Sequence, residues 1–281
     1  MRLNEEHHLK TITIGGDLTV HRIGLGTNRI RENEESRVLL LGAVERGIDF
    51  IDTADFYGHY ATERMIGNTL APYPKGLVIA TKGGMVPGDN TWNGSPEYLQ
   101  KALEGSLERL KLKRIDLYQL HRVDPRVPLK VTITFLKKMK DAGKIRHIGL
   151  SEVSVAQIEE ARSIVDIVSV QNEYNIITRK HEDVVHYCDA NKIAFLPYYP
   201  LGHGRVNLED ERILKLASNR KATVQQIALA WLLKRSPTML PIPGTLTLKH
   251  LEENLQALKF ELSDDEFKYL SEVSLPFSPS R

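Results

Sequence analysis

Two hydrophobic patterns follow one another along this 281-residue chain. Residues 11–20 alternate polar and apolar side chains around Gly15-Gly16-Asp17, which predicts a β-hairpin. After it, short apolar runs typical of buried strands alternate with longer stretches of helical periodicity. The predicted strands are 23–27, 47–51, 77–82, 115–121, 147–151, 167–171, 193–198 and 239–243. The predicted helices are 35–46, 62–70, 95–112, 129–142, 155–163, 181–191, 210–219, 224–235, 248–258 and 264–273.

This alternation of strands and helices predicts the fold class. Strands that alternate with helices form parallel crossover units, and eight such units suit a closed barrel better than an open sheet. No Gly-x-Gly-x-x-Gly motif follows a predicted strand, so a Rossmann fold lacks its fingerprint. We therefore predict a single α/β domain over residues 1–281. It is a (β/α)8 TIM barrel with an N-terminal β-hairpin over its bottom and extra C-terminal helices.

Composition limits the classes of partner. The 38 basic and 36 acidic side chains give a net charge of +2, which favours neither nucleic acid nor an anionic membrane. No apolar run approaches the ~20 residues of a membrane span, and the N-terminus lacks the apolar core of a secretory signal. Cys188 is the only cysteine, which fits a reducing compartment. We expect a cytoplasmic monomer that binds a small molecule and no metal, because neither His7-His8 nor the set His181, His186 and Cys188 has zinc-site spacing.

Polar side chains stand where the predicted strands end. Asp52 follows the second strand, and Tyr57 lies in the loop beyond it. Lys82 ends the third strand and His121 the fourth. The next three strands end in Ser151, Gln171 and Tyr198. Catalytic residues of (β/α)8 barrels come from this end of the strands, so the set predicts an active site.

The residue types predict acid–base chemistry. A phenol is a poor acid at neutral pH, and an adjacent ammonium lowers its pKa. We expect Lys82 to have this effect on Tyr57 while Asp52 holds Lys82 in place. His121 would donate to a substrate oxygen or help relay the proton. Such a group could protonate a carbonyl oxygen as it becomes an alkoxide.

Each residue alone has a plainer interpretation. Asp52 could cap the next helix, and Tyr57 could be an ordinary loop aromatic. Lys82 could be surface charge, or the Schiff-base lysine that some barrel lyases use. His121 could be a hydrogen-bonded core histidine. Four such residues at matching strand ends are better explained by a shared site.

The chain also carries four longer motifs: Asp52-Thr-Ala-Asp-Phe-Tyr57-Gly58, Thr81-Lys82, Gln119-Leu-His121-Arg-Val-Asp-Pro125 and Gly149-Leu-Ser151. In order and spacing they resemble the signatures of the aldo-keto reductase family over essentially the whole chain. The resemblance implies a TIM barrel that binds NADPH and passes a hydride from nicotinamide to the carbonyl carbon of an aldehyde or ketone. It makes Tyr57 the general acid, with Lys82, Asp52 and His121 completing a tetrad.

The resemblance implies a set of cofactor-binding residues. Gly26, Thr27, Asn28 and Asp52 would lie beneath the nicotinamide, Ser151 and Gln171 at its carboxamide, and Tyr198 against its ring. Leu201 and Gly202 would line the pyrophosphate path, with Ile242, Gly244, Thr245, His250, Glu253 and Asn254 at the adenosine end. A helix N-terminus after the last strand independently suits a phosphate.

Some positions depart from the family pattern. Glu152 stands where asparagine is usual after Ser151, so the carboxamide contact there differs. Gly244 and His250 stand where lysine and arginine are common near the 2′-phosphate. We therefore expect NADP(H), with NAD(H) as a weaker alternative.

The substrate is the least specified part of the sequence. The short tail 275–281 predicts an open site of broad specificity. Segments 170–175, 195–202 and 229–237 most resemble a compact bacterial branch that includes pyridoxal reductases (pyridoxine 4-dehydrogenases), so pyridoxal is a candidate. Trp92, in the long loop after the third strand, would wall the substrate pocket with Tyr57 and His121, unless it is only a loop aromatic packed on the barrel. The rival functions are a nicotinamide-sensing regulatory subunit, like potassium-channel β-subunits, and a Lys82 Schiff-base lyase.

Overall fold

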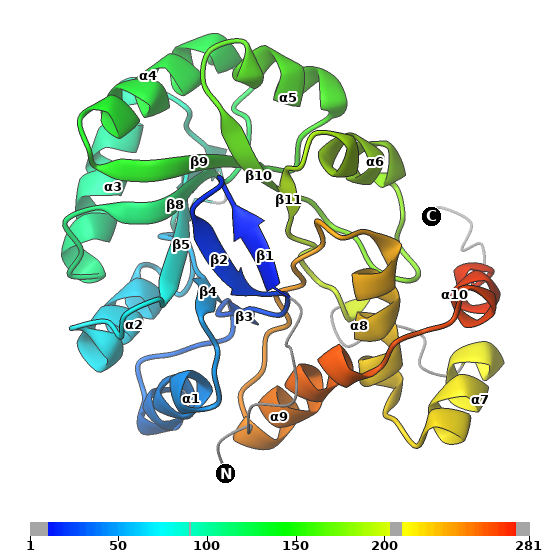
Figure 1. The fold of residues 1–281 in the computed structure, drawn as a ribbon. Helices are drawn as coiled ribbons and strands as arrows, with labels where there is room; N and C mark the ends of the chain where they lie inside the picture. Colours follow the sequence, from blue (N-terminus) through cyan, green and yellow to red (C-terminus); the bar gives the residue numbers. More distant parts are fainter. Residues whose placement is uncertain (1–10, 90, 203–209, 274–281) are drawn as a thin grey trace.

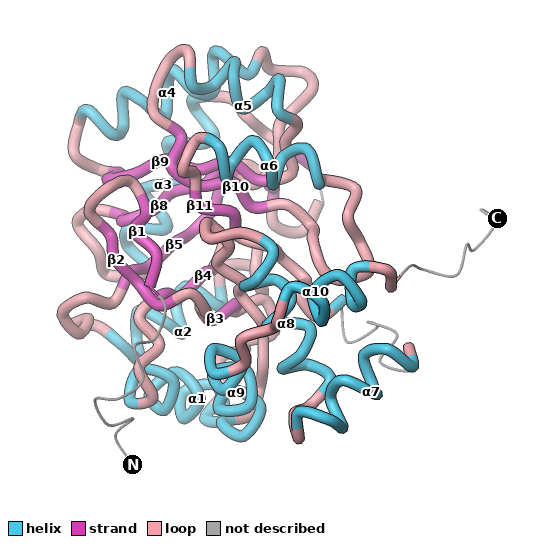
Figure 2. The backbone as a smooth tube through the Cα atoms, turned by 45° about the vertical axis from the view of Figure 1, so that its right-hand side comes forward, coloured by secondary structure: helices cyan, strands magenta, loops and turns pink. Residues whose placement is uncertain are grey.

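A parallel sheet curled into a barrel forms the centre of the molecule, with helices around it (Figures 1 and 2). The computed structural model describes residues 11–89, 91–202 and 210–273. Within these ranges the sheet has seven strands, in the order β3 to β11 around the barrel. They are β3 (Leu25–Gly26), β4 (Phe50–Asp52), β5 (Val78–Gly83), β8 (Ile115–Leu120), β9 (Ile145–Ser151), β10 (Ile167–Gln171) and β11 (Ala194–Phe195).

The helices lie where the sequence predicts them, within a few residues. Those between the strands are α1 (Glu34–Glu45), α2 (Ala61–Leu70), α3 (Pro96–Arg109), α4 (Leu129–Asp141), α5 (Val155–Arg162) and α6 (Glu182–Ala190). The C-terminal helices are α7 (Glu211–Arg220), α8 (Val224–Arg235), α9 (Leu248–Gln256) with a 3-10 turn (Ala257–Lys259), and α10 (Asp264–Ser271). Local signals set several ends: Ser95 caps α3 ahead of Pro96, and Gly143 follows α4 with a φ of 72°.

The predicted eighth strand closes the barrel without forming a regular strand. Residues 239–244 make only isolated parallel bridges, to Phe195 on one side and Gly26 on the other. Gly24 and Gly26 donate to the carbonyls of Pro241 and Pro243, at 3.0 and 3.3 Å. Proline has no N–H, so Pro241 and Pro243 cannot donate the hydrogen bonds that a regular strand ladder requires. The TIM-barrel prediction is confirmed, and the prediction of a strand at 239–243 is corrected to a bridged, proline-interrupted segment.

The N-terminal hairpin covers one end of the barrel, as predicted. It consists of β1 (Thr11–Ile14) and β2 (Leu18–His21), drawn in blue in Figure 1. Its apolar side chains pack into the lower barrel core, which comprises Ile14, Leu18, Val20, Phe50, Val78, Ala80, Leu117, Ala194, Leu196, Leu240 and Ile242. Because this end is plugged, a ligand must reach the barrel from the opposite end.

Three further details differ from the sequence predictions. The strand predicted at 23–27 is limited to Leu25–Gly26. The strand predicted at 193–198 is limited to Ala194–Phe195, because Pro197 interrupts it. The loop after β5 contains a small hairpin of β6 (Met85–Val86) and β7 (Thr91–Trp92). The prediction about the tail 275–281 lies outside the described residues.

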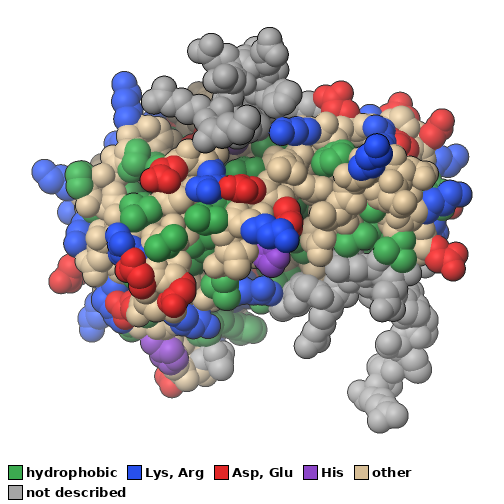
Figure 3. All heavy atoms as spheres, turned by 90° about the horizontal axis from the view of Figure 1, so that it is seen from below, with side chains coloured by type: hydrophobic (Ala, Val, Ile, Leu, Met, Phe, Trp, Pro, Cys, Tyr) green, Lys and Arg blue, Asp and Glu red, His purple; other side chains and the backbone are tan. Residues whose placement is uncertain are grey.

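The surface shows no large region of a single charge sign in the view of Figure 3, where basic and acidic side chains are interspersed. Within the described part of the chain, no helix combines the length and apolar character that a bilayer crossing requires.

Candidate active site

A buried ammonium lies at the centre of the candidate site. Lys82, in β5, is fully buried beside Asp52 at the end of neighbouring β4. Its Nζ donates to Asp52 Oδ2 at 2.7 Å, to the Thr53 carbonyl at 2.8 Å and to the Tyr57 hydroxyl at 3.2 Å. Burial alone would lower the pKa of Lys82, but Asp52 and Tyr57 outweigh burial, so its pKa lies above the usual value. Lys82 is therefore a fixed cation at neutral pH.

Amide side chains saturate the second oxygen of Asp52. Its Oδ1 accepts from Gln119 Nε2 at 3.2 Å and from Gln171 Nε2 at 2.9 Å. A carboxylate only accepts hydrogen bonds, so each amide must present its nitrogen to Asp52. Gln171 therefore keeps its Oε1 for another donor.

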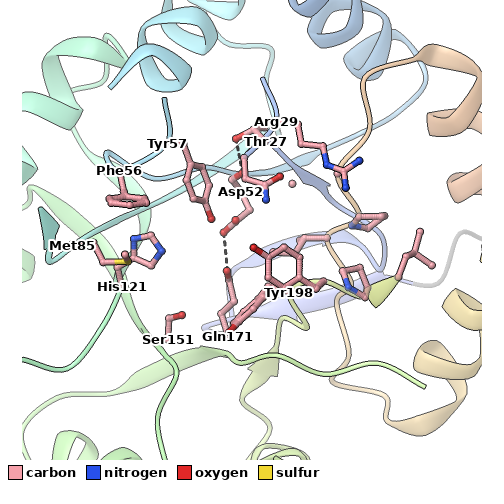
Figure 4. Close-up of a pocket in the computed structure, with 18 of the residues that line it drawn as sticks. Thr27, Arg29, Asp52, Phe56, Tyr57, Met85, His121, Ser151, Gln171 and Tyr198 are labelled. Atoms are coloured by element: carbon pink, nitrogen blue, oxygen red, sulfur yellow. Dashed lines mark hydrogen bonds between the residues drawn. The ribbon is translucent and has the colours of Figure 1, made fainter. Parts of the chain in front are cut away.

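Tyr57 lies in the loop after β4, with its ring 4.9 Å from Lys82 Nζ (Figure 4). Lys82 lowers the pKa of Tyr57, as expected, but a larger opposing effect was not predicted. Burial raises the pKa of Tyr57 above its usual value, and the Lys82 charge offsets only part of that rise. The phenol is therefore protonated at neutral pH, and Lys82 makes its later ionisation less costly.

His121 follows β8 and meets Tyr57 edge to face, with ring centroids 5.9 Å apart. Phe56 contacts the same imidazole at 6.0 Å. Burial and the nearby charges of Lys82 and Arg122 hold the pKa of His121 well below its usual value. The imidazole is therefore neutral and offers one N–H to the site.

A cavity opens beside this cluster at the carboxyl ends of the strands (Figure 4). Twelve of the predicted residues line it: Gly26, Thr27, Asn28, Asp52, Tyr57, His121, Ser151, Gln171, Tyr198, Leu201, Ile242 and Gly244. The sequence interpretation missed the other lining residues: Arg29, Phe56, Met85, Arg122, Tyr199, Pro200 and Pro243. Several of the missed residues directly adjoin a predicted one, which was the only available signal for them.

The wall between β9 and β10 carries a donor and an acceptor. Ser151 Oγ accepts from Arg122 Nη1 at 3.1 Å, so its own O–H can donate into the cavity. Gln171 Oε1 supplies the acceptor. One donor beside one acceptor complements a primary carboxamide, so these residues fit the amide of a nicotinamide.

Tyr198 supplies an aromatic face to the same cavity. It lies three residues beyond β11 and not at the strand end, and its backbone N–H donates to the Asn172 carbonyl at 3.2 Å. The Arg122 guanidinium lies 5.8 Å from the ring centroid.

Of the residues predicted at the adenosine end, Ile242 and Gly244 line the cavity, whereas Thr245, His250, Glu253 and Asn254 lie beyond its lining. Gly202 adopts φ 58° after Leu201. Thr245 is buried, and its Oγ1 accepts from the Thr247 N–H at 3.2 Å. Helix α9 begins after Thr247 and carries the other predicted residues, His250, Glu253 and Asn254. His250 lies in the first turn of α9, where the helix N-terminus suits an anionic ligand end, and Glu253 and Asn254 lie further along the helix.

Trp92 does not occupy the predicted position. It is 41% exposed and is absent from the cavity lining, whereas Met85, its partner in the β6–β7 hairpin, lines the cavity. Met85 is therefore the residue of this hairpin that lines the cavity.

The barrel and this cluster define a class: an α/β-barrel protein equipped for acid–base chemistry on a ligand held at the carboxyl ends of its strands. The sequence model of the Aldo/keto reductase family matches residues 22–275. An uncharacterized oxidoreductase of Schizosaccharomyces pombe is 44% identical over 92% of this chain and 88% of its own length. Pyridoxine 4-dehydrogenase of Escherichia coli is 37% identical over 94% of this chain and 98% of its own length.

Solved structures agree with these relatives. An aldo/keto reductase from Klebsiella pneumoniae in complex with NADP and acetate superposes with a TM-score of 0.83. It is 30% identical and is covered over 94% of its chain, with 93% of this chain aligned. The chain described here therefore belongs to the aldo/keto reductase family.

Proposed function

We propose that this protein reduces aldehydes or ketones to alcohols with NADPH, reversibly. The observation that carries the proposal is the Tyr57 hydroxyl held 3.2 Å from a buried Lys82 ammonium, which Asp52 fixes in turn. Such a pair can deliver a proton and then stabilise the phenolate that remains.

Each side chain has a definite task in this proposal. Tyr57 gives its proton to the carbonyl oxygen as negative charge develops there. His121, neutral at working pH, donates its N–H to the same oxygen and orients the carbonyl. Bound NADPH would supply the hydride. Lys82 remains protonated throughout, because its pKa is raised by Asp52 and Tyr57 against the effect of burial.

The cofactor would lie along the cavity. Ser151 and Gln171 would bind the carboxamide, and Tyr198 would stack on the nicotinamide ring. The adenosine end would extend past Gly244 to α9. The NADP complex of the Klebsiella pneumoniae relative supports NADP(H) as the cofactor.

The preference for NADPH depends on the cations near that end. Arg29 lines the cavity with no ion-pair partner among the described residues, and in Figure 4 its guanidinium lies on the side away from His121. Lys249 stands at the start of α9, and its only partner in the described chain is Glu253, at 3.9 Å. Both could meet phosphate groups, so we propose NADPH with weaker use of NADH.

Pyridoxal is the proposed substrate among small aromatic aldehydes. The Escherichia coli relative, pyridoxine 4-dehydrogenase, supports this choice. The side chains around Tyr57 also fit a flat ring, because Phe56, Met85 and His121 present mainly apolar and aromatic surface. We further propose that the protein is cytoplasmic and folds as one domain. We also propose that it is a monomer, which size-exclusion chromatography tests directly.

A Schiff-base lyase is disfavoured by the geometry of Lys82. Its Nζ makes three hydrogen bonds to protein acceptors, and its pKa lies above the usual value because Asp52 and Tyr57 outweigh burial. A nucleophilic lysine needs the neutral amine, so this environment opposes that role.

A substrate panel tests the proposal. NADPH and NADH oxidation would be measured with pyridoxal, methylglyoxal and an aromatic aldehyde. We expect turnover with NADPH, the highest kcat/KM on an aromatic aldehyde, and slower turnover with NADH. Tight NADPH binding with no turnover of any carbonyl would favour the nicotinamide-sensor alternative over the reductase.

A further inference from the structure

Arg122 brings a guanidinium to the cavity wall beside the acid–base cluster. It follows His121 directly after β8, and its side chain lines the cavity. Its Nη1 donates to the His121 carbonyl at 2.7 Å and to Ser151 Oγ at 3.1 Å. The guanidinium also lies 5.8 Å from the centroid of the Tyr198 ring, which lines the same cavity. These contacts hold the cation next to the proposed reaction centre.

One edge of this guanidinium has no partner in the described part of the chain. Nη1 makes both of the hydrogen bonds, whereas Nε and Nη2 donate to no acceptor among the described residues. No described carboxylate forms an ion pair with Arg122 either. The Nε–Nη2 edge of arginine is planar and carries two parallel donors, which match the two oxygens of a carboxylate.

Other arginines with little exposure have their donors taken up by the protein. Arg179 donates to backbone carbonyls from Nε, Nη1 and Nη2, at 2.7 to 3.0 Å. Arg109 pairs with Glu63 at 2.7 Å. The buried carboxylate of Asp52 accepts from an ammonium and two amides, so it does not serve as a partner for Arg122. A carboxylate that enters the cavity on a ligand would supply the acceptor that the described chain does not.

We propose that Arg122 is a specificity-determining residue that binds a carboxylate of the substrate while Tyr57 and His121 hold its carbonyl oxygen. The preferred substrates are then aldehydes or ketones that carry a carboxylate, on a body that packs against Phe56 and Met85. Pyridoxal would meet the same edge through its ionised ring hydroxyl, which is next to the aldehyde. The reduction itself is unchanged, and the anionic group remains on the alcohol. This inference rests on the proposed reductase function.

Matched substrates isolate the contribution of the anionic group. The acids 3- and 4-carboxybenzaldehyde would be compared with their methyl esters, which keep the ring and the aldehyde and lose the charge. For each isomer, the readout is kcat/KM for the acid divided by kcat/KM for the ester, at neutral pH with saturating NADPH. A change in cofactor affinity or in stability affects acid and ester alike, so it cancels from this ratio.

Three variants separate the charge, the planar edge and the location of the arginine. R122Q removes the charge, and R122K keeps the charge without the planar edge. R114Q is the matched control. Arg114 is exposed, directly precedes β8 and so lies at the opposite end of the same strand, and it does not line the cavity.

We expect the wild type to favour at least one acid over its ester about tenfold, as a charge-assisted hydrogen bond to substrate allows. R122Q should bring this ratio to about one, through a higher KM for the acid. R122K should keep an intermediate ratio of about threefold, because a point charge attracts the carboxylate without the paired hydrogen bonds. R114Q should match the wild type.

An acid-to-ester ratio that R122Q leaves unchanged would overturn the inference, and Arg122 would then only support Ser151. A wild type that reduces both esters at least as well as the acids would overturn it too. Neither result touches the reductase proposal, because the aldehydes are still reduced. Failure of the wild type to turn over any acid, ester or unsubstituted aldehyde would remove the proposed function itself, and the inference with it.

Discussion

At the scale of single residues, burial decides the direction in which the pKa of Tyr57 is shifted. A phenol beside an ammonium should ionise more readily, yet desolvation raises the pKa of Tyr57 further than Lys82 lowers it. The group therefore keeps its proton until a carbonyl oxygen takes it. Lys82 then has its effect on the phenolate that is left, which it contacts directly.

This balance predicts the pH dependence of catalysis. Reduction needs the protonated phenol, and a raised pKa extends that form to higher pH. We expect kcat/KM for reduction to be flat from about pH 6 to about pH 9 and to fall only above pH 10. His121 adds no inflection there, because burial, Lys82 and Arg122 hold its pKa well below the usual value. A fall in kcat/KM between about pH 7 and pH 8 would contradict this account.

The sequence could predict the residues of the cluster but not their electrostatics. Asp52, Lys82 and His121 end strands of one sheet, so their convergence followed from topology alone. The sign of the Tyr57 shift depends on how completely distant segments cover the ring, which no local pattern encodes. Arg122 was missed for a similar reason: an arginine after a strand usually reads as a surface charge.

At the scale of elements, hydrophobic periodicity predicted the helices and most strands well. It overestimated the strands that contain proline, because Pro197, Pro241 and Pro243 lie in apolar runs yet cannot donate to a ladder. It also missed the β6–β7 hairpin, whose strands are two residues each and too short to show an alternation.

The β6–β7 hairpin provides a paired test of the substrate wall. Met85 lines the cavity, whereas Trp92 is 41% exposed and does not line it. We expect M85A to lower kcat/KM for an aromatic aldehyde about tenfold through lost apolar contact. W92A, the matched control from the same hairpin, should stay within about twofold. Equal losses of kcat/KM in both variants would show that Trp92 also contacts the substrate.

The N-terminal hairpin should contribute a pH-dependent part of the stability. His21 in β2 pairs with Asp49 at 2.8 Å, and this hydrogen bond raises the pKa of His21 above its usual value. A raised histidine pKa means that the stabilisation is complete below about pH 6 and is lost as the pH rises through the folded-state value. We expect H21Q to cost about 1 kcal/mol of unfolding free energy at low pH and less at high pH.

Urea unfolding of wild type and H21Q at a series of pH values measures this difference. H186Q is a suitable control, because His186 is exposed on α6 and solvent screens its contact with Glu182. If the difference in unfolding free energy between wild type and H21Q increased with rising pH, it would contradict this account, because the His21–Asp49 pair should lose its stabilising effect as His21 is deprotonated.

At the scale of the whole molecule, the two ends of the barrel have separate functions. The hairpin and the lower core close one end, which leaves the carboxyl ends of the strands free to hold a ligand. The cavity there continues from His121 at the acid–base cluster to Gly244, next to the helix α9 region. A single long ligand could therefore present one end to Tyr57 and the other to the cations Arg29 and Lys249.

The barrel architecture could be predicted from the sequence because eight alternating strand and helix units favour a closed barrel. This holds even though the last predicted strand, 239–243, is irregular. It could not predict how far the cavity extends, since that depends on where loops from separate units meet.

The most direct test of the central claim is a labelled reduction of pyridoxal by wild type and Y57F. The cofactor would be NADPH that carries deuterium at the transferring C4 position. The account predicts that wild type forms an alcohol with deuterium on the former carbonyl carbon. Y57F should bind NADPH with unchanged Kd and lose at least about 100-fold in kcat, because it lacks only the proton donor. Undeuterated product from wild type, or a Y57F rate within a few-fold of wild type, would contradict it.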